Sequence, residues 1–472
     1  MISAALRRTL IAVGCAALVA GPAAAAELLS GYNADIGESS ISGISSGADM
    51  AVQFGIAWSS LIKGVGVVAG GPYDCAKADG DDFLNGYTLP ILNATGPCMV
   101  GPPPDLSDLW AKADAKAKAG AIDPLNGLGR QKLYVFHGYN DAVVARSVTD
   151  AAVDFYRHYL GDSNHGNLFY QSAIGAGHSL VVAQNAEDGL NNCQANTGPY
   201  INTCGYDQAG ILLQHIYGAL NPPNRGPLTG KIKIFEQSAY TKPDDPGSLS
   251  LGATGYVFVP SECENGAACR VHIALHGCKQ DFGDIDRRFV DDTGYNAWAD
   301  TNRLIVLYPQ TVASPFLPSN PQACWDWWSY INHQDSYVTK SGAQIRSIKA
   351  MLDALTSGAN VATGTTPAPD AAPDKVAVID SSDTAVDLAW TPQSGTLAYR
   401  VWRAGADGKF TAVGDVAGPS FADSGLTAGA AYRWRITALV DGVAGPASAE
   451  VAATTRTAPP PCETPGQCPI NQ

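Results

Sequence analysis

The sequence has few charged residues and is particularly short of positive ones. Only 16% of its 472 residues are charged, and 30 lysines and arginines face 44 acidic residues, which gives a formal net charge of −14 at pH 7. Nucleic acid or an anionic membrane would repel such a chain, so we expect neither as a partner. Low charge together with abundant small residues suits an exported protein that acts on a neutral partner.

The sequence also lacks a hydrophobic run long enough to span a bilayer. The apolar run 10–20 is too short. It follows the pair Arg7-Arg8 and precedes an alanine triplet at 24–26, which predicts a signal peptide over residues 1–26, cut before Glu27. We therefore expect a secreted protein, extracellular or periplasmic. Two alternatives stay open for this leader, a twin-arginine export signal and a lipoprotein signal at Cys15.

The cysteines lack the close pairs, with histidines nearby, that metal sites need, so we predict no metal site. Removal of the leader takes away one of eleven cysteines and leaves an even number, which suits an oxidising compartment. Their spacing predicts mostly local disulfides, with one long-range pair left over: Cys75 with Cys98, Cys193 with Cys204, Cys263 with Cys269, Cys462 with Cys468, and Cys278 with Cys324.

The length of the chain predicts more than one domain. A stretch rich in threonine, proline and alanine has no hydrophobic period and predicts a linker at 361–374. Alternating runs at 385–390, 398–402 and 431–437 predict strands of a small β-sandwich over 375–456, followed by a tail, 457–472, with a small disulfide loop. Trp390, the pair Tyr399 and Val401, and Leu426-x-x-Gly429-x-x-Tyr432 resemble the fibronectin type III pattern, with Tyr432 as its corner tyrosine.

Residues 27–360 alternate continuous apolar runs with longer amphipathic stretches. The runs 132–136, 271–275 and 304–308 are typical of strands buried on both faces of a parallel sheet. Segments 148–160 and 343–355 predict helices. This alternation predicts an α/β catalytic domain.

One serine lies in the pattern G-x-S-x-G, in which small residues let a strand turn sharply into a helix and expose the serine. The match is Gly43-Ile44-Ser45-Ser46-Gly47. Because the chain holds 50 glycines, the pattern could also arise by chance, and its context decides. Residues 39–44 can form the strand and residues 48–57 the helix, so we predict that Ser45 is a nucleophile.

A serine hydroxyl needs a base, and the base needs a carboxylate that fixes its tautomer. His178 lies in a glycine-flanked loop, whereas structural positions suit His158, His165, His215 and His333. Asp141 follows the strand 132–136, at the end where α/β enzymes gather catalytic groups, although it could also be an ordinary turn residue. We predict a triad in the order found in α/β-hydrolases: Ser45, Asp141 and His178.

The predicted nucleophile lies close to the mature N-terminus, which leaves no room for the oxyanion loop that precedes the serine in an α/β-hydrolase. A suitable loop, 275–280, follows the strand 271–275 instead, and this order predicts a circularly permuted α/β-hydrolase. The backbone N–H groups of Ser46 and Cys278 would then bind the oxyanion. A nucleophilic Cys278 is the alternative, against which its predicted disulfide with Cys324 argues.

Together these segments resemble the polyhydroxybutyrate depolymerase esterase family, in the type whose catalytic domain is permuted. The matching segments are 43–47, 69–75, 137–141, 175–178, 275–280, 308–310 and 324–328. The resemblance implies hydrolysis of esters of short 3-hydroxyalkanoates through an acyl-enzyme, without metal or organic cofactor. We expect a monomer that acts on a polyester or oligoester.

The resemblance also implies roles for single residues. Ser45, His178, Asp141 and Cys278 keep the roles given above, and the apolar acyl chain would contact three aromatic side chains: Tyr73, Trp325 and Trp327. Core packing is the alternative for these aromatic residues.

One departure from the family concerns the solid polymer. Secreted members usually carry a further module that adsorbs to it, and this chain ends soon after the sandwich, so amorphous polymer or soluble oligomers are the expected substrates. Two rival functions stay open: an esterase that removes feruloyl or acetyl groups from plant polysaccharide, and a non-catalytic surface-binding protein.

Overall fold

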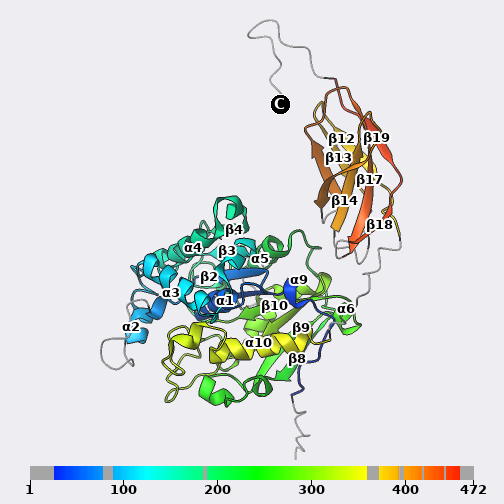
Figure 1. Cartoon of the computed structure of the whole chain (residues 1–472). Helices are drawn as coiled ribbons and strands as arrows, with labels where there is room; N and C mark the ends of the chain where they lie inside the picture. The colour runs from blue at the N-terminus through cyan, green and yellow to red at the C-terminus, as the bar shows by residue number, and fades with distance from the viewer. Residues whose placement is uncertain are drawn as a thin grey trace, which may run out of the picture.

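The computed structural model describes residues 26–77, 89–183, 189–358, 371–391, 393, 398–416, 419–440 and 443–457. Figure 1 shows an α/β domain, coloured blue to yellow, and a separate β-sandwich in orange and red. The predicted leader, linker and tail lie almost entirely outside the described residues. The domain boundaries at 26, 360, 374 and 456 therefore stay predictions.

An eight-stranded sheet forms the centre of the α/β domain. The six strands at one side of it run parallel, and the last two are antiparallel to their neighbours. In spatial order the strands are β4 (Leu168–Gln171), β3 (Lys132–Phe136), β2 (Gly64–Val68), β1 (Ser40–Ile44), β10 (Arg270–Leu275), β11 (Leu304–Tyr308), β9 (Thr254–Val259) and β8 (Lys231–Glu236).

The strands β3 and β11 are mostly apolar along their length because both faces of the sheet are covered there. Along β3, Leu133 and Val135 enter one core, and Tyr134 and Phe136 enter the other. On the first face pack α1 (Ser46–Ala57), α3 (Leu106–Lys118), α4 (Arg146–Leu160) and α10 (Ala343–Thr356), and on the second α5 (Gln208–Tyr217) and α9 (Tyr295–Thr301). Shorter helices are α2 (Leu89–Thr95), α6 (Ser261–Glu264), α7 (Phe282–Ile285) and α8 (Arg288–Asp292).

The predicted elements of this domain are confirmed with shifts of one or two residues at their ends. The strands expected at 132–136, 271–275 and 304–308 are β3, β10 and β11, and the helices expected at 148–160 and 343–355 are α4 and α10. The strand and helix predicted around Ser45 are β1 and α1.

The strand order confirms the circular permutation. The strand β10, far along the chain, pairs directly with β1, Gly43 lying opposite Leu275. The loop after β10 therefore lies beside Ser45 although more than half of the α/β domain separates them in sequence.

The second domain is the predicted two-sheet sandwich. One sheet holds β12 (Ala377–Ser381), β13 (Ala385–Ala389) and β16 (Ser420–Ser424). The other holds β15 (Thr411–Val416), β14 (Ala398–Ala404), β17 (Ala431–Val440), β18 (Val443–Ala447) and, paired with β17, β19 (Val451–Thr454). Trp390, Tyr399 and Trp434 fill its core, and the hydroxyl of Tyr432 accepts a hydrogen bond from the Thr427 N–H at 3.0 Å, as expected of a corner tyrosine.

Four of the five predicted disulfides are confirmed: Cys75–Cys98, Cys193–Cys204, Cys263–Cys269 and Cys278–Cys324. The fifth, Cys462 with Cys468, lies outside the described residues. Among the helices of the described ranges, none combines the length and apolar character that a bilayer crossing needs.

Candidate active site

Ser45 occupies a strained turn between β1 and α1. Its backbone angles, φ 56° and ψ −127°, are unusual for a residue with a side chain. The turn needs its two glycines, because a Cβ on Gly43 would lie 2.2 Å from the Gly47 carbonyl oxygen and one on Gly47 would lie 2.3 Å from that of His276. The residues around Ser45 therefore form the predicted sharp strand-to-helix turn.

Asp141 and His178 are joined by a hydrogen bond. His178 Nδ1 lies 2.8 Å from Asp141 Oδ2, and both side chains are almost fully buried. The other carboxylate oxygen of Asp141 accepts the N–H groups of Val143 at 2.8 Å and Val144 at 2.9 Å. With both of its oxygens engaged, the carboxylate has a fixed orientation.

The surroundings of Asp141 favour its charged form. Burial alone would raise the pKa of Asp141, but the hydrogen bond and charge of His178 and the two backbone N–H groups outweigh it and lower the pKa. An ionised carboxylate accepts the Nδ1 proton of His178, which leaves Nε2 free to accept a proton from another group. This is the tautomer that a general base needs.

Ser45 and the Asp141–His178 pair follow strands that end at the same edge of the sheet. Ser45 N–H donates to Val68 O at the end of β2, and Ala69 N–H donates to Phe136 O at the end of β3. The acid loop continues from β3. Within the described residues no hydrogen bond joins Ser45 Oγ to His178, so the structure brings the acid and the histidine into direct contact and brings the serine to their edge of the sheet.

The loop after β10 carries one predicted oxyanion donor and is tied to the histidine side of the site. Gln280 accepts the Gly277 N–H at 2.8 Å and donates to Pro199 O at 2.8 Å. The neighbouring Tyr200 ring lies edge-on to His178, with 5.9 Å between the ring centres. A Cβ on Gly277 would lie 3.2 Å from Ser45 Cβ, so this loop passes directly beside the nucleophile.

His276 holds this loop against the loop after β11. Its Nδ1–H donates to Gly277 O at 2.8 Å, and Nε2 accepts from Thr311 N at 3.2 Å. Burial lowers the pKa of His276 to about 4, so the ring is neutral at neutral pH and has one donor and one acceptor. His276 is therefore a structural residue of the loop, a role that the sequence analysis did not predict.

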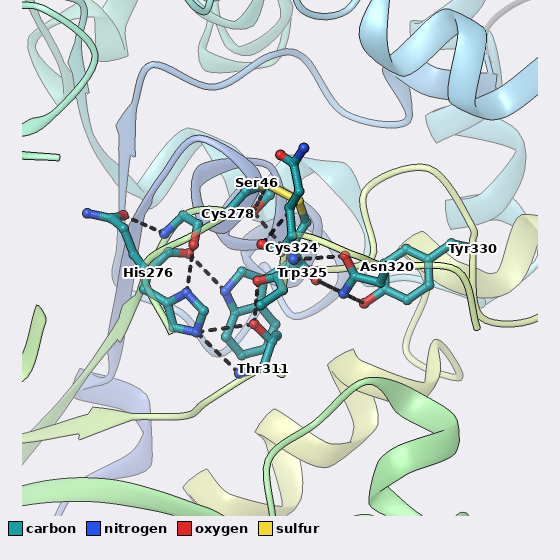
Figure 2. The surroundings of a disulfide bond; sticks show 12 residues. Ser46, His276, Cys278, Thr311, Asn320, Cys324, Trp325 and Tyr330 are labelled. Carbon is teal, nitrogen blue, oxygen red and sulfur yellow. Dashed lines mark hydrogen bonds between the residues drawn. A yellow bond between two sulfur atoms is a disulfide. The ribbon is translucent and has the colours of Figure 1, made fainter. Parts of the chain in front are cut away.

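The two predicted oxyanion donors, Ser46 and Cys278, lie next to each other in the cluster drawn in Figure 2. The Cys278–Cys324 disulfide lies against Ser46, whose Oγ is 3.3 Å from Cys278 Sγ and accepts the Trp325 N–H at 3.3 Å. A disulfide sulfur has no proton, so Ser46 Oγ is the donor of the first contact. Ser46 is the first residue of α1, where backbone N–H groups have no acceptor within the helix.

An apolar cavity of about 820 Å³ opens beside this disulfide. Trp327, predicted to contact the acyl chain, lines it together with Trp328 and Leu317. The other two predicted wall residues, Tyr73 and Trp325, are fully buried and do not line it. Tyr73 donates its hydroxyl to Val338 O and Trp325 donates its indole N–H to His276 O, so both fit the core-packing alternative.

The polar residues that hold the loops in place could not be predicted from the sequence. Gln280 was noted only as part of a motif, and Asn196 was not noted although its side chain contacts both the acid loop and the histidine loop. No local sequence pattern predicts the role of either residue, because each binds backbone groups that are distant in sequence. In the part of the chain that the structure describes, no three His, Cys, Asp or Glu side chains are grouped to hold a metal ion.

Comparison with curated proteins finds relatives over most of the chain. It is 38% identical to a poly(3-hydroxybutyrate) depolymerase of Delftia acidovorans over 438 residues, which cover 91% of this chain and 81% of that protein. It is 35% identical to a polyhydroxybutyrate depolymerase of Talaromyces funiculosus over 360 residues, which cover 74% of this chain and 96% of that protein. No protein-family model matches the chain.

Solved structures resemble the α/β domain. A serine-to-alanine variant of a PHB depolymerase complexed with R3HB trimer superposes with a TM-score of 0.62 at 33% identity, over 70% of this chain and 99% of that one. The PHB depolymerase from Penicillium funiculosum superposes with a TM-score of 0.61 at the same identity and coverage. Sequence and fold agree, and the chain belongs to the poly(3-hydroxybutyrate) depolymerase family.

Proposed function

We propose that the protein is a serine esterase that hydrolyses poly(3-hydroxybutyrate) or its oligomers with Ser45 as nucleophile, His178 as base and Asp141 as the carboxylate that orients it. The observation that carries the proposal is the 2.8 Å hydrogen bond between His178 and Asp141 at the sheet edge where Ser45 follows β1. Relatives that are 35–38% identical to this chain over the aligned residues are named for the same reaction.

In the first half of the reaction, Ser45 Oγ attacks the ester carbonyl carbon and His178 Nε2 takes the hydroxyl proton. The carbonyl oxygen becomes an oxyanion, which the N–H groups of Ser46 and Cys278 bind. The carbon–oxygen bond of the ester then breaks. His178 returns its proton to the departing alkoxide, which leaves as the free hydroxyl end of the chain.

In the second half, a water molecule attacks the acyl-enzyme. His178 takes one proton from the water, the second oxyanion forms in the same place, and the bond to Ser45 Oγ breaks. The serine regains its proton from His178, and the acyl group leaves as a carboxylic acid. No group outside the triad, the two N–H donors and water is needed to balance these steps.

Apolar contacts suit the binding of an uncharged polyester. The cavity is lined by Cys278, Trp327 and Leu317, so an acyl chain held there would lie next to Cys278, one of the two proposed oxyanion donors. At its mouth Leu317 is 91% exposed, and the adjacent Phe316 is 84% exposed. These two side chains offer a contact for polymer outside the cavity.

The disulfides support a location outside the cytoplasm. Four disulfides among the described residues are typical of a protein in an oxidising compartment, which is consistent with the predicted leader at 1–26. We therefore propose a location outside the cell or in the periplasm, and of these two the extracellular one gives access to an external polymer.

The test compares the purified protein with a Ser45→Ala variant on four substrates: a 3-hydroxybutyrate trimer, p-nitrophenyl butyrate, a feruloyl sugar and an acetyl sugar. We expect the wild type to release 3-hydroxybutyrate from the trimer and the variant to be inactive. Turnover of the sugar esters alone would replace the proposed substrate with the rival one. Unchanged activity of the folded Ser45→Ala variant would overturn the proposed nucleophile.

A further inference from the structure

A single amide side chain contacts both loops that carry the Asp141–His178 pair. Asn196 Oδ1 accepts the backbone N–H of His178 at 2.7 Å and that of Ala142 at 3.0 Å. Asn196 Nδ2 donates to the carbonyl oxygen of Asn140 at 3.1 Å. The residue thus binds the acid loop on both sides of Asp141 and the histidine loop at His178 itself.

These contacts need both the carbonyl oxygen and the NH₂ group of an amide side chain. One oxygen accepts two N–H groups, and the nitrogen beside it donates to Asn140 O and to Gln194 O at 3.2 Å. A carboxylate could accept the same N–H groups but could not donate. An alanine would leave both N–H groups without this acceptor.

The segment that carries Asn196 is itself firmly held. Cys193 forms a disulfide with Cys204, and the fully buried Asn202 donates to the carbonyl oxygens of Cys193 at 3.0 Å and Ala195 at 2.8 Å. A Cβ on Gly177 would lie 2.2 Å from Ala195 O, so the histidine loop packs directly against this segment. Asn196 therefore offers its amide from a fixed position.

The acid and histidine loops also contact each other without Asn196, but at a different place. Asn140 N–H donates to Ala176 O at 3.0 Å, and its side chain donates to Gly175 O at 2.8 Å. Both acceptors precede His178 in the loop. The Asn196 amide, by contrast, binds the backbone of His178 and the backbone on either side of Asp141.

We infer that Asn196 is a positioning residue, which keeps the Asp141–His178 hydrogen bond in the geometry that base catalysis needs. The inference rests on the proposed function, since it assigns Asn196 a role in that reaction. Asn196 takes no part in proton transfer, and it acts through the two loops. Small displacements of a catalytic group are costly, because a shift of about 1 Å can lower a rate by about a hundredfold.

The experiment compares Asn196→Ala, Asn196→Asp and the control Asn191→Ala in the full chain with p-nitrophenyl butyrate. Asn191 lies just before Cys193, and its amide donates to Thr197 O at 2.7 Å and Gly198 O at 3.3 Å, in the disulfide segment and not in the acid or histidine loop. We expect Asn196→Ala to lose about tenfold to a hundredfold in kcat with little change in KM. Asn191→Ala should keep the wild-type kcat.

The Asn196→Asp variant adds a readout that a merely structural residue would not move. It keeps the acceptor for both N–H groups, so its activity at high pH should exceed that of Asn196→Ala. Its negative charge beside the pair favours the protonated imidazole, so the pH at which half of kcat is reached should rise. Asn196→Ala adds no charge, so it should not raise this pH.

Two results would overturn the inference: a folded Asn196→Ala variant with kcat within twofold of the wild type, or equal losses in Asn196→Ala and Asn191→Ala. If Asn196→Ala does not fold, an Asn196→Asp variant with the wild-type pH midpoint overturns it. Failure of the proposed function is seen separately, because wild-type protein without esterase activity, or an active Ser45→Ala variant, would contradict that proposal.

Discussion

Cys278 and Cys324 form a disulfide that joins the loop after β10 to the loop after β11. Cys278 carries one proposed oxyanion donor. Cys324 directly precedes Trp325, and the N–H of Trp325 donates to Ser46 Oγ (Figure 2). Both proposed oxyanion donors therefore touch this one crosslink. Its loss should affect stability and catalysis together.

We predict that Cys278→Ser with Cys324→Ser lowers the free energy of unfolding by about 4 kcal/mol, the chain-entropy value for the 46-residue separation of these cysteines. The variant should also lose kcat on p-nitrophenyl butyrate, because the Cys278 N–H is no longer held. Urea unfolding and steady-state kinetics measure the two effects.

The matched control for this prediction is the pair Cys263→Ser and Cys269→Ser. This disulfide spans a sequence separation of only 6 and should contribute about 2 kcal/mol. It lies at α6, away from the loop after β10, so kcat should not change. Equal losses of kcat in both double variants would show that the effect is general destabilisation.

The second prediction concerns Gly47, the residue of α1 that lies against the end of β10. A Cβ here would lie 2.3 Å from His276 O and 2.6 Å from Leu275 O, and backbone atoms cannot move aside as a flexible side chain can. Gly47→Ala should therefore cost about 1–3 kcal/mol of stability and push the loop at His276 away from Ser45. We expect kcat to fall, whereas Gly166→Ala, where a Cβ meets nothing within 4 Å, should change neither quantity. A Gly47→Ala variant with wild-type kcat would contradict this account of the turn.

The sequence predicted those parts of the site that follow from local patterns. Ser45 could be found because its turn demands glycines at 43 and 47. The segment β10 could be placed beside β1 because too little chain precedes Ser45 for an oxyanion loop, and the loop 275–280 directly follows a predicted strand. The four confirmed disulfides followed mostly from short spacings. Each of these predictions depends on residues close together in the chain or on a rule of fold topology.

The sequence did not predict which aromatic residues are exposed or which amides hold the loops. Tyr73 and Trp325 resemble Trp327 in type, and only the packing of distant segments such as that of Val338 decides that the first two are buried. Asn196 bonds to backbone groups of three separate segments. Such partners leave no trace in the residue types nearby.

The third prediction concerns acid stability and His272, which is fully buried between two serines of β1. Ser40 Oγ lies 2.7 Å from its Nδ1 and Ser42 Oγ lies 2.8 Å from its Nε2. Burial lowers the pKa of His272 to about 3, whereas in the unfolded chain a histidine takes a proton below about pH 6.5. The contribution of His272 to the free energy of unfolding is therefore fully present above about pH 6.5. It falls by about 1.4 kcal/mol per pH unit as the pH is lowered towards 3.

A His272→Gln variant should lose this dependence. As the pH is lowered, its free energy of unfolding should fall less steeply than that of the wild type, by the slope that corresponds to the uptake of about one proton. Urea unfolding at a series of pH values between about 7 and 4 measures the slope. His158→Gln, a change at an exposed position of α4, serves as the control and should keep the wild-type slope. Equal slopes for His272→Gln and the wild type would show that another group causes the acid sensitivity.

The last prediction asks which surface meets solid polymer. Phe316 is 84% exposed, lies beside the mouth of the cavity and does not line it. If its ring is buried against poly(3-hydroxybutyrate), Phe316→Ser should weaken binding to a polymer film by about 1.5 kcal/mol, or about tenfold, with unchanged kcat on soluble p-nitrophenyl butyrate. Ile379→Ser is the matched change on the sandwich, where Ile379 is 63% exposed in β12. The two side chains lie on different domains, so each variant tests the adsorption of one domain. A film-binding defect in Ile379→Ser with normal binding by Phe316→Ser would instead assign adsorption to the sandwich.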